Sequence, residues 1–310
     1  MAMSKCKESI MVYGISGSGK TTQGQELAKF VHRELHKKVR LVSTSGGGWT
    51  SIQPAIDAGL VTPTYVRTRP HPVETLNRLT QGWWPEDPDD PESPLLPIEK
   101  QKDWEDVGGL MFDGATESAD WLMSYIVREE AAGRMKSSAQ NLAANFKDGD
   151  TSFGTPGLAH YGNIQQRMED FVTNSKGIQG IYVMWTALEL KATDDEGTKL
   201  PMYGPDICGK KKTSKAPAWF DNTLHMYIAG AGGLKQGTPA TRRLYLNTHF
   251  ESDGIPYVAK NRGHFYAPLP EFLENTPKEP NACSVDHFLK LLGESHVTAT
   301  KKLKAELGIG

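Results

Sequence analysis

The chain has 310 residues, of which 35 are Lys or Arg and 37 are Asp or Glu, so its formal net charge at pH 7 is −2. This length suits one large α/β domain or two small domains. The near-neutral charge excludes the globally basic surface of a protein that coats nucleic acid, so any contact with nucleic acid would have to be local.

The N-terminus and the cysteines bear on the compartment in which the protein works. The first residues, MAMSKCKESIMVYG, lack the apolar centre of a signal peptide, and no stretch approaches the ~20 apolar residues that a membrane span needs. Cys6, Cys208 and Cys283 are far apart and match no metal-ligand spacing, which is typical of reduced thiols. We therefore expect a cytoplasmic protein with no membrane contact.

The first predicted unit is a strand, a loop and a helix. Residues 9–14, SIMVYG, form a short apolar run that breaks into glycines. In the segment that follows, Leu27, Val31 and Leu35 recur four apart, as on one face of an amphipathic helix. A second strand is predicted at residues 39–45, VRLVSTS, and it ends in three glycines.

The middle of the chain alternates between helical, irregular and strand patterns. Helices are predicted at residues 51–60 and 73–79, and another from about 120 to 132. The acidic, Pro-rich stretch 85–97, PEDPDDPESPLLP, indicates an exposed excursion without regular structure. Residues 107–113, VGGLMFD, predict a buried strand that ends in Asp113, and the polar, glycine-rich residues 146–157 indicate a mobile loop.

The second half predicts a helix near 163–172 and a strand at 180–190, followed by a mobile polar loop at 191–215. Further strands are predicted at 222–230, 242–250 and 257–262, the last two as a hairpin through residues 252–254. Helix-separated strands followed by hairpin strands indicate an α/β fold: a mainly parallel sheet flanked by helices, with antiparallel strands at one edge. A helical tail, 277–310, carries an apolar stripe of Val285, Phe288, Leu289 and Leu292.

The segment GISGSGKT, Gly14 to Thr21, matches the phosphate-binding loop pattern G-x-x-x-x-G-K-[ST] and lies between a predicted strand and a predicted helix. Such a loop directs backbone N–H groups and the helix N-terminus at phosphate oxygens. Lys20 would reach the β- and γ-phosphates of ATP, and the Thr21 hydroxyl would coordinate Mg²⁺. The predicted nucleotide-binding residues are Gly14, Ser16, Gly17, Ser18, Gly19, Lys20, Thr21 and Thr22.

Two residues at predicted strand ends complete this site. Asp113 follows an apolar run, as the Walker B aspartate does, and its carboxylate would hold Mg²⁺ together with Thr21. Thr186 ends the next predicted core strand, where its hydroxyl would contact the γ-phosphate. An aspartate at a strand end is also a common turn residue, and threonines are common in cores, so the P-loop carries most of this prediction.

Two basic segments lie far from the P-loop in sequence. The run GKKKTSK contains Lys210, Lys211, Lys212 and Lys215, which would either be solvated or neutralise a nucleic-acid backbone. Lys260 and Arg262 stand two apart in YVAKNRGHF, so on a strand both would point to one face. On an exposed sheet face they would simply be solvated.

Taken together, the P-loop, the Asp113 strand, the Thr186 strand and the late Lys-x-Arg resemble the RecA-like ATPases, a superfamily that includes KaiC and the DnaB-type helicases. The similarity covers residues 8–270, and only the P-loop is specific. It implies a RecA-like core at 1–276 and assembly into a ring or filament. Lys260 and Arg262 would then act as a catalytic finger on the neighbouring subunit's nucleotide. The most similar members are phage-encoded ATP-binding proteins, some of them recombinases or single-strand annealing proteins, which implies single-stranded DNA as partner and the host cytoplasm as location.

The sequence departs from these ATPases at the catalytic glutamate, which usually follows the second core strand and orients the attacking water. Here that strand runs into STSGGGWTS, which has no acid, and Asp57 or Glu117 would have to substitute. Two alternatives therefore stay open: a nucleotide or small-molecule kinase, for which no arginine-rich lid is evident, and an interaction module that ATP orders without hydrolysis.

Overall fold

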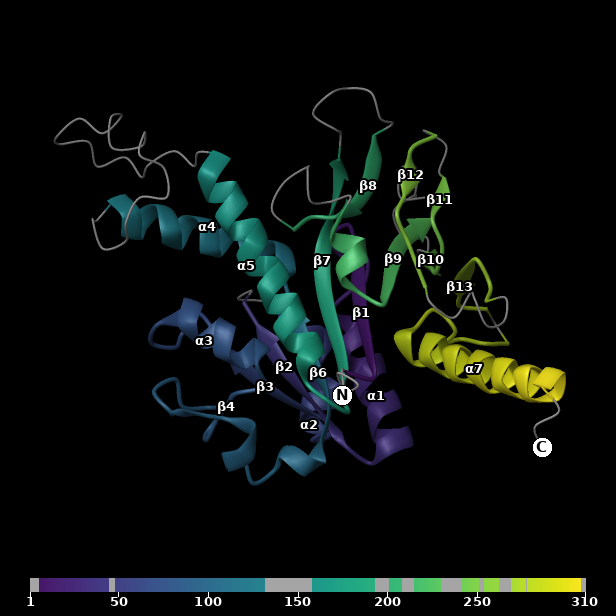
Figure 1. Cartoon of the computed structure of the whole chain (residues 1–310), viewed down its shortest axis with the longest axis horizontal. Coiled ribbons are helices and arrows are strands. Elements are labelled where there is room, and N and C mark those ends of the chain that lie inside the picture. The colour runs from purple at the N-terminus through teal and green to yellow at the C-terminus, as the bar shows by residue number, and fades with distance from the viewer. Residues whose placement is uncertain are drawn as a thin grey trace.

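The computed structural model describes residues 6–44, 48–131, 158–192, 201–207, 215–229, 241–250, 254–261, 269–276 and 278–307. A central sheet runs through the molecule with helices on both sides (Figure 1). Its parallel strands lie in the order β3 (Val61–Tyr65), β2 (Lys38–Ser43), β6 (Val107–Asp113), β7 (Tyr182–Ala192), β1 (Glu8–Gly14) and β9 (Asn222–Ala229). Antiparallel strands β10 (Thr241–Tyr245) and β13 (Phe272–Glu274) follow β9. The predicted α/β class, with a mainly parallel sheet and antiparallel strands at one edge, is confirmed.

A smaller group of strands continues from the end of β7. There β8 (Met202–Pro205) pairs antiparallel with β7, β12 (Pro256–Tyr257) pairs with β8, and β11 (His249–Phe250) pairs antiparallel with β12. The predicted hairpin pairing of the last two segments is therefore present.

Two other predictions need correction. The stretch 191–215 is not one loop, because it contains the end of β7 and all of β8. The predicted strand 257–262 is reduced to β12 and one isolated bridge between Lys260 and Thr223.

The helices form one layer on each face of the sheet (Figure 1). One face packs on α1 (Thr22–Leu35), α2 (Gln53–Asp57) and α7 (Val285–Leu307), and the other on α3 (Pro72–Thr80), α4 (Ala115–Ala131) and α5 (Leu158–Gly177). Because side chains alternate along a strand, β1 sends Ile10 and Val12 into the first layer and Met11 and Tyr13 into the second. A strand buried on both faces reads as a continuous apolar run, which is why β1 was evident in the sequence.

The acidic stretch 85–97 contains regular structure that was not predicted. The two-residue strands β4 (Trp84–Pro85) and β5 (Leu95–Leu96) pair antiparallel, and short 3₁₀ turns follow at Ile98–Lys100 and Trp104–Asp106. The loop between β4 and β5 wraps around the buried guanidinium of Arg69, which donates to the carbonyls of Pro88, Pro91 and Ser93 at 3.3 to 3.4 Å. These backbone contacts hold the loop in place while its carboxylates face solvent.

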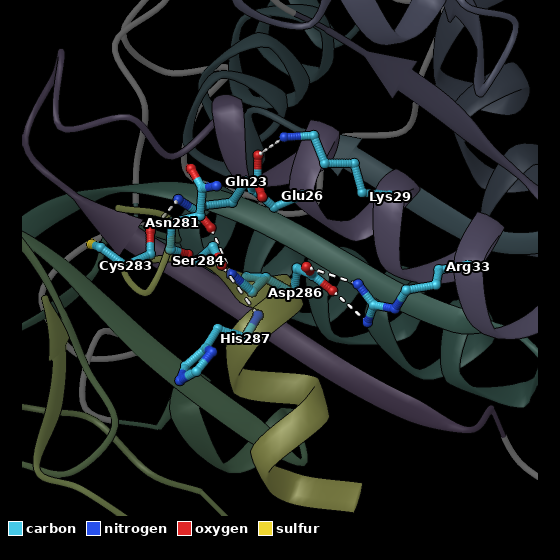
Figure 2. Close-up of polar contacts among 10 residues, drawn as sticks. Gln23, Glu26, Lys29, Arg33, Asn281, Cys283, Ser284, Asp286 and His287 are labelled. Carbon is cyan, nitrogen blue, oxygen red and sulfur yellow. Dashed lines mark hydrogen bonds and ion pairs between the residues drawn. The ribbon is translucent and has the colours of Figure 1, made fainter. Parts of the chain in front are cut away.

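The C-terminal helix α7 begins as part of the core. The predicted stripe of Val285, Phe288, Leu289 and Leu292 is buried against α1. An ion pair of 2.8 Å between Arg33 of α1 and Asp286 of α7 also joins the two helices (Figure 2). From about residue 297 the side chains of α7 are mostly exposed, and the helix extends away from the sheet (Figure 1).

None of the helices among the described residues is both long and apolar enough to span a lipid bilayer.

Candidate nucleotide-binding site

The P-loop connects the carboxyl end of β1 to the N-terminus of α1. Gly17 and Gly19 have φ angles of 76° and 102°, in the left-handed region that residues with a Cβ rarely adopt. Gly14 lies where β1 approaches β9, since an added Cβ would come within 2.2 Å of the Met226 carbonyl oxygen. The loop therefore needs its three glycines, two for backbone conformation and one for close packing.

Lys20 lies inside the curve of this loop. Its Nζ donates a 2.8 Å hydrogen bond to the carbonyl of Ile15, across the loop. Burial lowers the pKa of Lys20, while the carboxylates of Glu117, Asp113 and Glu189 act in the opposite direction. The ammonium group is therefore partly desolvated, and the nearby carboxylates favour its charged form.

Three side chains from separate parts of the chain meet beside the P-loop. The Thr21 hydroxyl lies 3.1 Å from Asp113 Oδ1, and Thr186 donates a 2.6 Å hydrogen bond to the same oxygen. Thr186 also accepts the N–H of Gly114 at 3.0 Å. The strands β1, β6 and β7 are parallel, and β7 continues past the ends of the other two, so Thr186 in the middle of β7 lies beside Asp113 at the end of β6 and near the loop that follows β1.

Some of the groups around Asp113 raise its pKa, and others lower it. Burial raises the pKa of Asp113 from its ordinary value, and the nearby charge of Glu117 acts in the same sense. The hydrogen bonds from Thr186 and Thr21, and the charge of Lys20, lower it. A divalent cation at this carboxylate would favour the ionised form further.

A cavity of about 570 Å³ opens over this cluster. Among the predicted nucleotide-binding residues, the cavity wall includes Ser16, Gly17, Gly19, Lys20, Thr21, Thr22, Asp113 and Thr186. Ser18, whose side chain is fully buried, and Gly14, which packs against β9, are not part of the wall. Residues that the motifs did not indicate complete the wall: Gln23, Glu26, Ser51, Gly114, Glu117, Ala187, Leu188, Arg242, Asn275, Asn281, Cys283 and Ser284.

The two candidates for a catalytic carboxylate have different locations. Glu117, in the first turn of α4, lines the cavity, and its carboxylate packs so close to Gly114 that an added Cβ there would lie 2.9 Å from its Oε2. Asp57, the last residue of α2, is outside the cavity wall and accepts a hydrogen bond from Gln53 at 2.8 Å. Only Glu117 therefore lies beside Lys20 and Asp113.

Arg242 is a cavity residue that sequence reasoning missed. It lies on β10, next to the P-loop, where an added Cβ on Gly19 would come 3.7 Å from its Cδ and Nε. The next residue, Arg243, instead forms an ion pair with Glu274 and lies over the ring of Phe272. Adjacent strand residues point to opposite faces, so the pair RR in the predicted strand contained the signal, but the sequence did not show which cation would face the P-loop.

The predicted finger and DNA contacts are only partly within the described structure. Lys260 is not in the cavity wall of its own chain, and its Nζ donates a 3.1 Å hydrogen bond to the carbonyl of Pro217. Arg262 lies outside the described residues, as do Lys210, Lys211 and Lys212. Lys215 is exposed, just before the 3₁₀ turn at Ala216–Trp219.

The residues present suit a magnesium nucleotide. Among the described residues, no group of three or more His, Cys, Asp or Glu side chains is arranged to hold a metal. Mg²⁺ commonly binds through one or two protein oxygens together with substrate phosphates and water. The Thr21 hydroxyl and the Asp113 carboxylate, in mutual contact beside Lys20, form such a pair.

No protein-family model matches this chain, and no curated protein matches it significantly.

Proposed function

We propose that this protein binds and hydrolyses ATP with Mg²⁺, as a RecA-like ATPase that acts on single-stranded DNA in phage recombination or replication. One observation carries the ATP part of the proposal: the contact between Thr21 and Asp113 at the N-terminus of α1, beside Lys20. An ordinary glycine-rich turn would not require a buried carboxylate from another strand at that position, because burying a charge without compensation is unfavourable.

The phosphates would lie over the P-loop. Backbone N–H groups of the loop and the N-terminus of α1 bind phosphate oxygens, and the Lys20 ammonium exchanges its bond to Ile15 for the β- and γ-phosphates. When bound at Thr21 and Asp113, Mg²⁺ neutralises charge on the same phosphates. The Thr186 hydrogen bond keeps the Asp113 carboxylate oriented toward this position.

Hydrolysis needs a water placed in line with the bond between the γ-phosphorus and the bridging oxygen. Glu117 is the carboxylate in the cavity that can hold this water and accept its proton while the bond to the bridging oxygen breaks and ADP leaves. Arg242, close to Gly19, can stabilise the negative charge that spreads over the transferring phosphoryl group. In this proposal Glu117 takes the place of the acid that is missing after β2.

The DNA and assembly parts of the proposal rest on the resemblance and on the two basic segments. The run containing Lys210, Lys211, Lys212 and Lys215 would neutralise the backbone of a single strand. Lys260 and Arg262 would reach the nucleotide of the next subunit in a ring or filament. Since Lys260 does not line the cavity of its own chain, any action on a nucleotide would have to be in trans.

The test is phosphate release from ATP with and without single-stranded DNA, with Lys20→Ala as the inactive control. Stimulation by DNA supports the whole proposal. If single-stranded DNA does not change the rate of ATP hydrolysis, the ATPase part of the proposal stands and the DNA part fails. Tight ATP binding without turnover would favour the interaction module, and transfer of the γ-phosphate to a small acceptor would favour the kinase.

Neutralising the four lysines at 210–212 and 215 tests the DNA contact separately. For each phosphate contact that is lost, the slope of log affinity for DNA against log salt concentration should become less steep by about one. The affinity for ATP should not change. Unchanged DNA binding and salt dependence would exclude these lysines as the contact.

A further inference from the structure

The cavity extends beyond the part that the phosphates of a nucleotide would occupy. Beyond the P-loop it continues along the first turns of α1, past Thr22 to Glu26. These two residues are four apart and lie one helical turn from each other on the same face. A triphosphate held at the loop would therefore direct the rest of its molecule toward Glu26.

The far wall is a segment that enters from the opposite end of the sequence. It consists of Asn275, which follows β13, and of Asn281, Cys283 and Ser284, which precede α7. The side chain of Gln23 fixes these residues on α1, because its Oε1 accepts the N–H of Val285 at 2.8 Å and its Nε2 donates to the carbonyl of Cys283 at 3.5 Å.

Two further hydrogen bonds hold the same segment together. Asn275 Oδ1 accepts the N–H of Cys283 at 2.7 Å. The Ser284 hydroxyl donates to the carbonyl of Asn281 at 2.8 Å and accepts the N–H of His287 at 3.1 Å at the start of α7. The wall is therefore built from ordered, mutually bonded residues opposite the first turns of α1.

Glu26 presents a carboxylate to this part of the cavity. Its side chain is 13% exposed and forms a 2.7 Å ion pair with Lys29, whose side chain is 46% exposed (Figure 2). An ion pair with a solvated lysine one turn away contributes little to stability, so the carboxylate can form hydrogen bonds with a ligand at small cost.

We propose that this half of the cavity holds the ribose of the nucleotide, with the Glu26 carboxylate accepting hydrogen bonds from the ribose 2′- and 3′-hydroxyls. The site would therefore select ribonucleotides over 2′-deoxyribonucleotides. Carboxylates bind ribose hydroxyls in this way in other nucleotide sites. The inference rests on the proposed nucleotide function, and it goes further by naming the sugar and the residue that recognises it.

Charge supports this orientation of the ligand. A phosphate beside Glu26 would be repelled, whereas the P-loop end, although it also holds Asp113 and Glu117, offers N–H groups, Lys20 and Arg242 to a phosphate. Neutral hydroxyl groups are donors that a carboxylate accepts well. The cavity thus has one end that suits anions and one end that suits hydroxyl donors.

The experiment compares the dissociation constants of ATP, dATP and tripolyphosphate in the presence of Mg²⁺. We expect wild type to bind ATP about tenfold more tightly than dATP, which is the effect of one hydrogen bond to a charged group. Glu26→Ala should bring this ratio close to one and leave tripolyphosphate binding unchanged. Glu26→Gln should give an intermediate ratio, because a neutral carbonyl accepts more weakly.

Two control variants come from the same helix. Glu34→Ala removes a carboxylate that pairs with Arg33 and does not line the cavity, so the ratio should stay at its wild-type value. Lys29→Ala removes the partner of Glu26 but keeps the carboxylate, and should also preserve the preference for ATP.

The outcomes separate this inference from the function on which it rests. If wild type binds ATP and dATP equally while tripolyphosphate competes, the ribose contact is overturned and the phosphate site stands. The same holds if Glu26→Ala keeps the wild-type ratio. If neither ATP nor tripolyphosphate binds, the proposed function fails and the ribose site fails with it.

Discussion

Thr186 donates a 2.6 Å hydrogen bond to Asp113 and accepts the N–H of Gly114, so one threonine in the middle of β7, and not at its end as predicted, holds the carboxylate at the end of β6. The bond favours the ionised carboxylate and opposes the effect of burial. A metal-binding role for Asp113 therefore depends on a residue in a different strand.

Replacing Thr186 with valine tests this dependence. Without the hydroxyl, the pKa of Asp113 should rise further, because burial remains while a hydrogen bond to the charged form is lost. We expect Mg²⁺ to support ATP binding about tenfold less well, as titrations at several pH values would show. Thr186→Ser keeps the hydroxyl and should behave like wild type; an equal loss in both variants would argue that packing, rather than the bond, matters.

Asp113→Asn should weaken the Mg²⁺ dependence of ATP binding and raise the melting temperature of the ligand-free protein at pH 7. Burial raises the pKa of Asp113 in the folded protein above its value in the unfolded chain. The contribution of Asp113 to the free energy of unfolding therefore falls as the pH rises between these two pKa values. An amide carries no charge at either pH. The difference in melting temperature should disappear in acid, where the wild-type carboxyl is protonated in both states. A less stable variant at neutral pH would contradict this account.

Lys20→Ala should abolish ATP binding or turnover and leave the fold intact. The ammonium contacts the loop carbonyl of Ile15 and contributes charge, not core packing. ATP titration and thermal melting of the same sample check both parts. Wild-type affinity with normal hydrolysis would show that the P-loop assignment is wrong.

Glu117→Gln should lower turnover by about 10² or more and leave ATP affinity nearly unchanged, since an amide can position water but cannot accept its proton. Asp57→Asn is the matched control, because Asp57 does not line the cavity. Single-turnover hydrolysis measures the chemical step directly. If Asp57→Asn is the slower variant, the roles assigned to the two carboxylates are reversed.

Arg242 and Arg262 can be separated by mixing variants. Arg242 lies at the P-loop of its own chain, so Arg242→Ala mixed with Lys20→Ala should regain no activity. Arg262→Ala mixed with Lys20→Ala should regain part of it, because mixed assemblies would pair an intact P-loop with an intact finger from its neighbour. A wild-type protein that remains monomeric with ATP and DNA at full activity would exclude the trans finger. If the mixture of Arg242→Ala and Lys20→Ala regains activity, Arg242 does not act on the nucleotide of its own chain.

Predictions from the sequence succeeded where the information is contiguous along the chain. The apolar run of β1, the glycines of the P-loop and the periodicity of α1 are local patterns with local physical causes. The stripe on α7 was predicted for the same reason. Five short strands, β3, β4, β5, β8 and β13, were missed, because two to five residues carry too little periodicity, and β3 also contains Pro63.

The sequence alone contains the P-loop motif with its strand and helix, and it predicted Asp113 and Thr186 as candidates to join it. Only the tertiary structure decided which distant side chains share the cavity. Glu117 lies in the cavity wall, Asp57 lies outside it, and Arg242 lies beside Gly19. The physical reason is that parallel strands bring their carboxyl ends to one edge in an order set by sheet topology. Neighbours at that edge are therefore separated by up to hundreds of residues along the chain, and no local pattern records their contact.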